Sequence, residues 1–161
     1  MPQPCPETAL LTFTDQAGVQ QFQYQFTFVG VTYDSATGFS TFTYNVCKPG
    51  TDSTFKDLSH FVIGFSPDCP IQLTPNQPGV EFVNPDPTTG AVGIKIDTPV
   101  ATAVCPLVNT YSFTLNGFAD VGPVTITAKD GAQGGIQFFT SGTICGPICT
   151  PVPGARGFRL Q

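Results

Sequence analysis

Alternating apolar and polar residues are the most regular feature of this chain. In residues 21–28 every second residue is aromatic, and Gln or Thr lies between. A period of two places one side of a strand in a core and the other side in water. The same period recurs at residues 42–46, 92–96, 111–115 and 124–128, and residues 58–65 form a nearly continuous apolar run. We predict a strand at each segment, with 58–65 central in its sheet.

Proline and glycine separate these segments. The chain has 16 prolines and 17 glycines, and no stretch shows helical spacing over three turns. Asp130-Gly131 is a strong tight-turn signal, so residues 136–139 are expected to form a return strand. Short strands between turn signals predict an all-β fold, an antiparallel β-sandwich of jelly-roll-like or immunoglobulin-like type.

The alternation also predicts a core. The inward positions are mostly aromatic or β-branched, and such side chains suit a half-buried pleated surface. The residues expected to be buried are Phe22, Phe26, Phe42, Tyr44, Phe61, Ile63, Val92, Ile94, Phe113, Leu115, Val124 and Ile126. Residues 18–149 are taken as the single sandwich domain, residues 1–17 as an extended N-terminal arm, and residues 150–161 as a C-terminal tail.

Six cysteines are spread along the chain, at positions 5, 47, 69, 105, 145 and 149. No pair has the CxxC spacing of a zinc site, and the single histidine, His60, supplies only one further ligand. Disulfides are therefore favoured, and no metal or cofactor is expected. We predict a bond between Cys47 and Cys69, with Cys105, Cys145 and Cys149 also in disulfides, and an oxidising surrounding.

Charge excludes some partners. Charged residues make up 11% of the chain, with a net charge of −5 and no basic stripe, so nucleic-acid binding is not expected. Apolar runs are too short for a membrane helix, and the first residues lack the pattern of a signal peptide. We expect no membrane insertion, and a location outside the cell or on a cell or spore surface.

Two short segments invite a chemical interpretation. Asp57, Ser59 and His60 are close in sequence, but alternation along a strand would point Ser59 and His60 to opposite faces, away from hydrogen-bond reach. The segment Asn84-Pro85-Asp86-Pro87 could offer oxygens to calcium, yet it holds one carboxylate and two stiff prolines. We expect no enzyme activity, and interpret the second segment as a turn.

From residue 42 onward, several short motifs occur in a suggestive order: Leu58-Ser59-His60-Phe61, Gly93-Ile94-Lys95-Ile96-Asp97, Phe113-Thr114-Leu115-Asn116-Gly117, Lys129-Asp130-Gly131 and Gly142-Thr143-Ile144. In this order the chain resembles a bacterial secreted or spore-surface β-sandwich domain of unknown function. The arm with its prolines and cysteine is similar in architecture to subunits of spore appendages and related extracellular fibres. The resemblance implies no catalytic residues.

These features favour a structural subunit that assembles with copies of itself into an extracellular or spore-surface fibre. The arm would add a strand to a neighbour's sheet through Leu10, Leu11 and Phe13, and Cys5 would form an intersubunit disulfide. The glutamine-bearing strand at 21–25 is either an ordinary half-buried strand or an edge that pairs with another chain. A monomeric surface adhesin or carbohydrate-binding module is the alternative function.

Overall fold

The structure is a computed structural model of the whole chain, and it describes residues 3–14, 21–50, 58–97, 103–130 and 139–149. No helix occurs in these ranges. The strands are β1 (Thr8–Thr14), β2 (Gln21–Asp34), β3 (Phe39–Cys47), β4 (Leu58–Gly64), β5 (Val80–Val83), β6 (Gly93–Asp97), β7 (Asn109–Leu115), β8 (Asp120–Asp130) and β9 (Phe139–Ile148). The predicted all-β class is confirmed.

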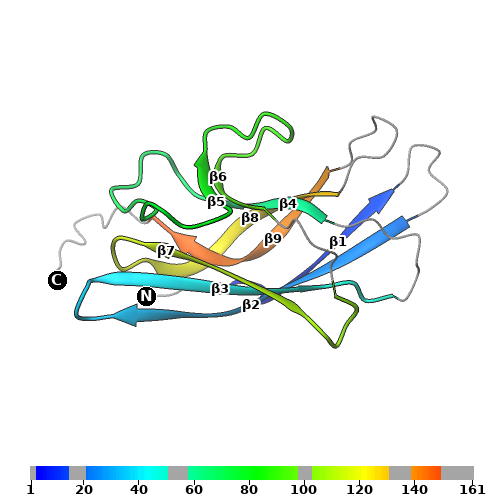
Figure 1. Cartoon of the computed structure of the whole chain (residues 1–161), viewed down its shortest axis with the longest axis horizontal. Coiled ribbons are helices and arrows are strands. Elements are labelled where there is room, and N and C mark those ends of the chain that lie inside the picture. Colours follow the sequence, from blue (N-terminus) through cyan, green and yellow to red (C-terminus); the bar gives the residue numbers. More distant parts are fainter. Residues whose placement is uncertain (1–2, 15–20, 51–57, 98–102, 131–138, 150–161) are drawn as a thin grey trace.

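Two antiparallel sheets form the sandwich (Figure 1). Sheet A has four strands in the order β1-β2-β3-β7, and sheet C has five in the order β5-β6-β4-β8-β9. Strand β4 has a neighbour on each side, as its apolar run predicts. The chain passes from sheet A to sheet C between β3 and β4, so neighbours in sequence are not always neighbours in space.

Aromatic side chains from both sheets fill the interior. Phe26 of sheet A meets Phe61 of sheet C with ring centroids 5.2 Å apart, and Phe42 stacks on Phe113 at 5.6 Å. Nine of the predicted core residues are buried: Phe26, Phe42, Tyr44, Phe61, Ile63, Ile94, Phe113, Leu115 and Ile126. Val92 and Val124 are only half-buried, and the side chain of Phe22 lies outside the described set.

The N-terminal arm forms part of its own sandwich. Strand β1 pairs with β2, with Leu11 opposite Tyr24 and Phe13 opposite Phe22, and Leu11 and Phe13 are buried in the core. The edge reading of the glutamine strand is therefore wrong, because β1 covers one side of β2 and β3 the other. Only Leu10, on the outer face, remains exposed for a contact with a neighbour.

Disulfides join segments that are distant in sequence. The bonds are Cys5–Cys145, Cys47–Cys105 and Cys69–Cys149. The predicted bond between Cys47 and Cys69 is wrong, because Cys47 ends a strand of sheet A whereas Cys69 follows β4 of sheet C. Cys47 lies beside the segment before β7, where Lys48 N–H donates to the Ala103 carbonyl at 2.7 Å.

Cys5, expected to bond a neighbouring subunit, is bonded within its own chain instead. The main chain holds this part of the arm in place as well, since Cys145 N–H donates to the Pro6 carbonyl at 2.8 Å and Gln3 N–H to the Val121 carbonyl at 2.8 Å. Three disulfides indicate an oxidising, extracellular-type environment. No helix in the described ranges is long and apolar enough to cross a membrane.

The return strand predicted after Asp130-Gly131 falls only partly within the described residues. Strand β9 begins at Phe139, and residues 136–138 lie outside the described set. Its sequence contains two glycines and a proline, which are weak strand formers. The long pairing with β8, from Phe139 opposite Lys129 to Ile148 opposite Asp120, holds this sequence in a strand.

Candidate functional site

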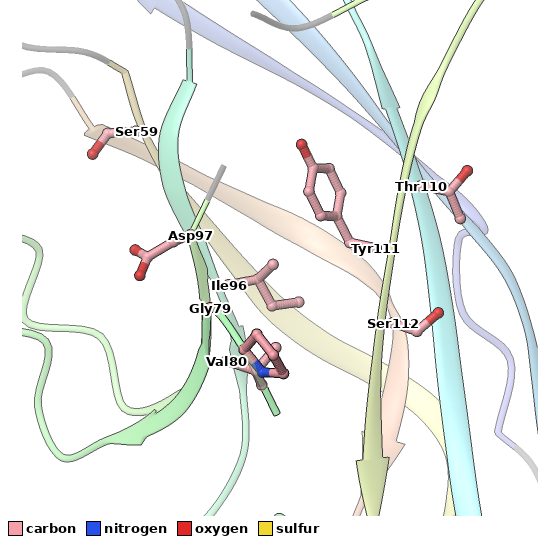
Figure 2. Close-up of a pocket in the computed structure, with 9 residues that line it drawn as sticks. Ser59, Gly79, Val80, Ile96, Asp97, Thr110, Tyr111 and Ser112 are labelled. Atoms are coloured by element: carbon pink, nitrogen blue, oxygen red, sulfur yellow. The ribbon is translucent and has the colours of Figure 1, made fainter. Parts of the chain in front are cut away.

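A groove lies along one open side of the sandwich, between the edge of β7 in sheet A and strands β5 and β6 in sheet C (Figure 2). It encloses about 750 Å³. Its lining consists of Ser59, Pro78, Gly79, Val80, Ile96, Asp97, Thr110, Tyr111 and Ser112. The volume lies within the range of about 300–1,000 Å³ that is usual for ligand sites.

Alternation along β7 divides the side chains of this edge between two surfaces. Figure 2 shows the ring of Tyr111 directed into the space toward Ile96, whereas Thr110 and Ser112 point to the other side of the sheet. On that outer side, Thr110 Oγ1 donates to Asn45 Oδ1 at 2.7 Å, and Ser112 Oγ lies 3.0 Å from Thr43 Oγ1. These hydrogen bonds fix β7 against β3 and leave its free edge toward the groove.

The main chain of β7 has polar groups that face the groove. In an antiparallel pair, successive residues alternately turn their N–H and C=O groups toward the partner strand and away from it. Thr114 turns away from β3, because its N–H donates to Gln77 Oε1 at 2.8 Å and its carbonyl accepts from Thr74 N–H at 3.0 Å. Ser112 and Thr110 lie two and four residues before Thr114 in the same regular pairing, so their main-chain N–H and C=O groups also point away from β3.

The two halves of the β7 edge therefore differ. The Thr114 half is covered by residues 72–77, which form a bridge between Leu73 and Leu115. At Thr110 and Ser112, no described residue makes a hydrogen bond with the outward main-chain groups. The open half offers two donors and two acceptors beside an apolar floor of Val80, Ile96 and the Tyr111 ring.

Edge strands in soluble proteins are commonly protected by charge, by proline or by a cover. The sequence of β7, NTYSFTL, contains neither a charged residue nor a proline. Asp97, half-exposed at the end of β6, is the one charged residue among the described residues that line the groove. In the part of the chain that the structure describes, no strand pairs with the Thr110 and Ser112 side of β7, and β7 itself carries no charge or proline to oppose such pairing.

A polar network covers the outer face of sheet C close to this groove. His60 Nε2 lies 2.8 Å from Asp86 Oδ2, and Ser59 Oγ lies 3.3 Å from His60 Nδ1. The expectation that Ser59 and His60 are out of reach of each other is wrong. The pairing of β4 with β8 shifts between Leu58 and His60, and this bulge changes the strand alternation at Ser59.

Asp86 is fully buried and holds the loop before β6 against the sheet. Its carboxylate accepts hydrogen bonds from the hydroxyls of Thr88 and Thr89, at 3.1 and 2.7 Å, as well as the contact with His60. Burial alone would raise the pKa of Asp86, but the hydrogen bonds from Thr89 and His60, the His60 charge and the Thr88 bond lower it to about 2. The carboxylate that was considered for calcium and interpreted as part of a turn therefore accepts hydrogen bonds from protein donors.

The order Asp86, His60, Ser59 matches the order of groups in serine hydrolases, where a carboxylate orients an imidazole beside a hydroxyl. Here the imidazole is 4% exposed, and the contact from Ser59 is at the long end for a hydrogen bond. These features suit a network that fastens the loop at 84–91. In the described residues, no three His, Cys, Asp or Glu side chains are grouped for a metal.

Sequence reasoning did not find the groove. Its described lining residues come from four separate segments of the chain. Of these segments, only the one with Thr110 and Ser112 differs from an ordinary strand, because one of its edges has no described partner strand. The absence of charge in residues 109–115 is the one signal available in the sequence.

No family model matches the chain, and searches for similar curated proteins and similar solved structures found no match. The resemblance to bacterial surface β-domains thus stays a prediction.

Proposed function

We propose that this domain is a non-catalytic structural subunit of an extracellular or spore-surface assembly, and that the open edge of β7 receives an extended segment from a neighbouring copy. The carrying observation is the pair of outward-facing residues, Thr110 and Ser112, above an apolar floor. A strand added there would satisfy four main-chain groups and bury side chains over Val80 and Ile96.

The shape of the groove favours a single strand over a whole second sandwich. Sheet A has one strand fewer than sheet C, and β5 and β6 lie across the groove from β7 (Figure 2). A second sandwich pairing its own β7 here would bring its sheet C against β5. One extended segment fits as a fifth strand of sheet A, with alternate side chains toward Ile96.

The role of the N-terminal arm differs from the one first expected. Strand β1 and Cys5 are engaged in their own chain, which removes both the predicted donor strand and the predicted intersubunit disulfide. Strand addition to the edge of β7 depends on neither of them. A contact between an edge and a segment elsewhere on the next copy is head-to-tail, and repeated contacts of this kind form a filament.

The substitution Ser112→Pro tests the proposal. It removes an N–H that faces the groove and leaves the bonds of β7 to β3 in place. The matched control is Ser141→Pro, at an exposed serine of the edge strand β9. Cys145 N–H points away from β8, because it donates to the Pro6 carbonyl, and Ser141 lies four residues earlier in the same regular pairing. The N–H of Ser141 therefore also points away from β8.

The readout is molar mass by light scattering and filament formation by electron microscopy, on oxidised protein over a concentration series. We expect assembly of the wild type and of Ser141→Pro, and monomers for Ser112→Pro with an unchanged far-ultraviolet spectrum. A wild type that stays monomeric at every concentration, or equal assembly of both variants, would contradict the proposal.

A further inference from the structure

A second groove lies at a different part of the sandwich, where β2 extends toward the β2–β3 hairpin and the chain enters β8. It is lined by Val31, Tyr33, Phe118, Ala119, Asp120 and Val121 and encloses about 620 Å³. Two aromatic rings dominate it, and both are exposed: Tyr33 by 48% and Phe118 by 54%. No residue of this groove lines the one beside β7.

The two rings are held in fixed positions. Tyr33 donates its hydroxyl hydrogen to the Ala119 carbonyl at 2.7 Å, and its ring meets Phe118 edge to face with centroids 5.2 Å apart. The loop that carries Phe118 is fastened to the sheet, since Ser40 Oγ donates to the Gly117 carbonyl at 2.6 Å. A ligand would therefore meet rings that need little ordering, which lowers the entropic cost of binding.

Two exposed aromatic rings in contact with each other, Tyr33 and Phe118, are an unusual feature of a protein surface. A large apolar side chain at the surface loses the stabilisation that burial would give it. Tyr33 and Phe118 form a contiguous pair, whereas single exposed apolar residues are common and need no partner. Phe139, 52% exposed on β9, meets no other aromatic ring among the described residues.

We propose that the Tyr33–Phe118 groove binds a pyranose unit of a neutral glycan. The C–H bonds on one face of a pyranose ring suit the electron-rich face of an aromatic ring. The carboxylate of Asp120, at the wall of the groove, suits sugar hydroxyls as donors.

Charge selects among possible glycans. Asp120 lines the groove, Asp34 follows Tyr33 in the chain, and the whole chain carries a net charge of −5. Burial and the Asp120 charge both raise the pKa of Tyr33, so its phenol stays neutral. Asp120 is the one charged residue among the described residues that line the groove, so uronates and sialylated sugars would meet a like charge, and a neutral glycan avoids this repulsion.

The probe is a printed array of neutral and acidic oligosaccharides, followed by titration of the oxidised full chain with the best neutral hexasaccharide. We expect selective binding of neutral glycans, with amide shift changes at Tyr33 and Ala119 in nuclear magnetic resonance spectra. The substitution Phe118→Ala should weaken binding about tenfold, which corresponds to the loss of one aromatic stacking contact. The matched control Phe139→Ala should leave the affinity unchanged.

Three results would overturn the proposal: no binding of any neutral glycan, preference for acidic glycans, or equal loss of affinity in Phe118→Ala and Phe139→Ala. A drop in molar mass in Phe118→Ala would instead make the two rings a contact between subunits. Glycan binding at Tyr33 and Phe118 does not depend on assembly through β7, so the Ser112→Pro variant should bind the glycan like the wild type.

Discussion

The two sides of this β-sandwich, where the edge strands of the two sheets face each other, differ in how closely those strands approach. On one side, the edge strands β1 and β9 contact each other, and the bond between Cys5 and Cys145 closes them. On the other side, β7 and β5 are separated by the groove. Both sides present strand edges, but only the first is closed by contacts within the described part of the chain.

The side of the sandwich with β1 and β9 is closed by close packing between these two strands. A Cβ added at Gly142 of β9 would lie 2.7 Å from Leu11 Cδ2, so a larger residue there would require the end of the Leu11 side chain to shift. Tyr44 donates its hydroxyl hydrogen to the Cys145 carbonyl at 2.8 Å across the sandwich, and burial raises the pKa of this phenol. The contacts at β1 and β9 thus join both sheets.

Removing the disulfide between Cys5 and Cys145 should have the largest effect on the free energy of unfolding. The substitutions Cys5→Ser and Cys145→Ser together open a loop with a sequence separation of 140 residues. In the chain-entropy model, such a loop contributes about 5 kcal/mol to the free energy of unfolding. Chemical denaturation of the double variant against the wild type measures this loss. A loss below that of a surface substitution would show that packing alone closes this side.

Truncation of one aromatic side chain on each side sharpens the comparison. Phe13 is buried on the closed side, so Phe13→Ala should lower the free energy of unfolding by about 3–5 kcal/mol. Tyr111 is half-buried beside the groove, so Tyr111→Ala should cost about 1–2 kcal/mol. Equal costs in urea denaturation would mean that the two sides do not differ in packing.

The buried network next to the groove should respond to acid. The pKa of Asp86 is lowered from 3.8 to about 2 in the folded chain, so its ionised form stabilises the fold above pH 4. That contribution should be lost as the pH falls from about 4 to about 2. The substitution Asp86→Asn should lower the free energy of unfolding at pH 7 by about 2 kcal/mol. Its acid sensitivity between pH 4 and 2 should be smaller than that of the wild type, and an identical pH profile would contradict this role.

Sequence periodicity predicted the interior well, because a two-residue period directly reports which face of a strand is buried. It placed Phe42 and Phe113 correctly without any knowledge of strand order. It failed for the arm, where Leu11 and Phe13 show the same period as a strand that docks on a neighbour. Periodicity does not distinguish pairing within a chain from pairing between chains.

The site was less predictable, because it depends on which strands become neighbours. Ser59 and His60 contact each other only through a bulge, and Asp86 reaches His60 from 26 residues away. Likewise, Cys47 and Cys69 were predicted as partners because they flank a strand and a loop, although Cys47 ends a strand of sheet A and Cys69 follows β4 of sheet C. The contact of Ser59 with His60 depends on the bulge in β4, and the separation of Cys47 from Cys69 depends on the crossover between β3 and β4. Neither feature leaves a local signal in the sequence.

Amide hydrogen exchange at β7 tests the central claim most directly. The N–H groups of Thr110 and Ser112 should exchange quickly in dispersed protein and far more slowly in the assembled form, because a strand added by a neighbour would take up both. Ser141 N–H, on the edge strand β9, should exchange at the same rate in both forms. Fast exchange at Thr110 and Ser112 in assembled material would contradict the proposal that β7 is the accepting edge.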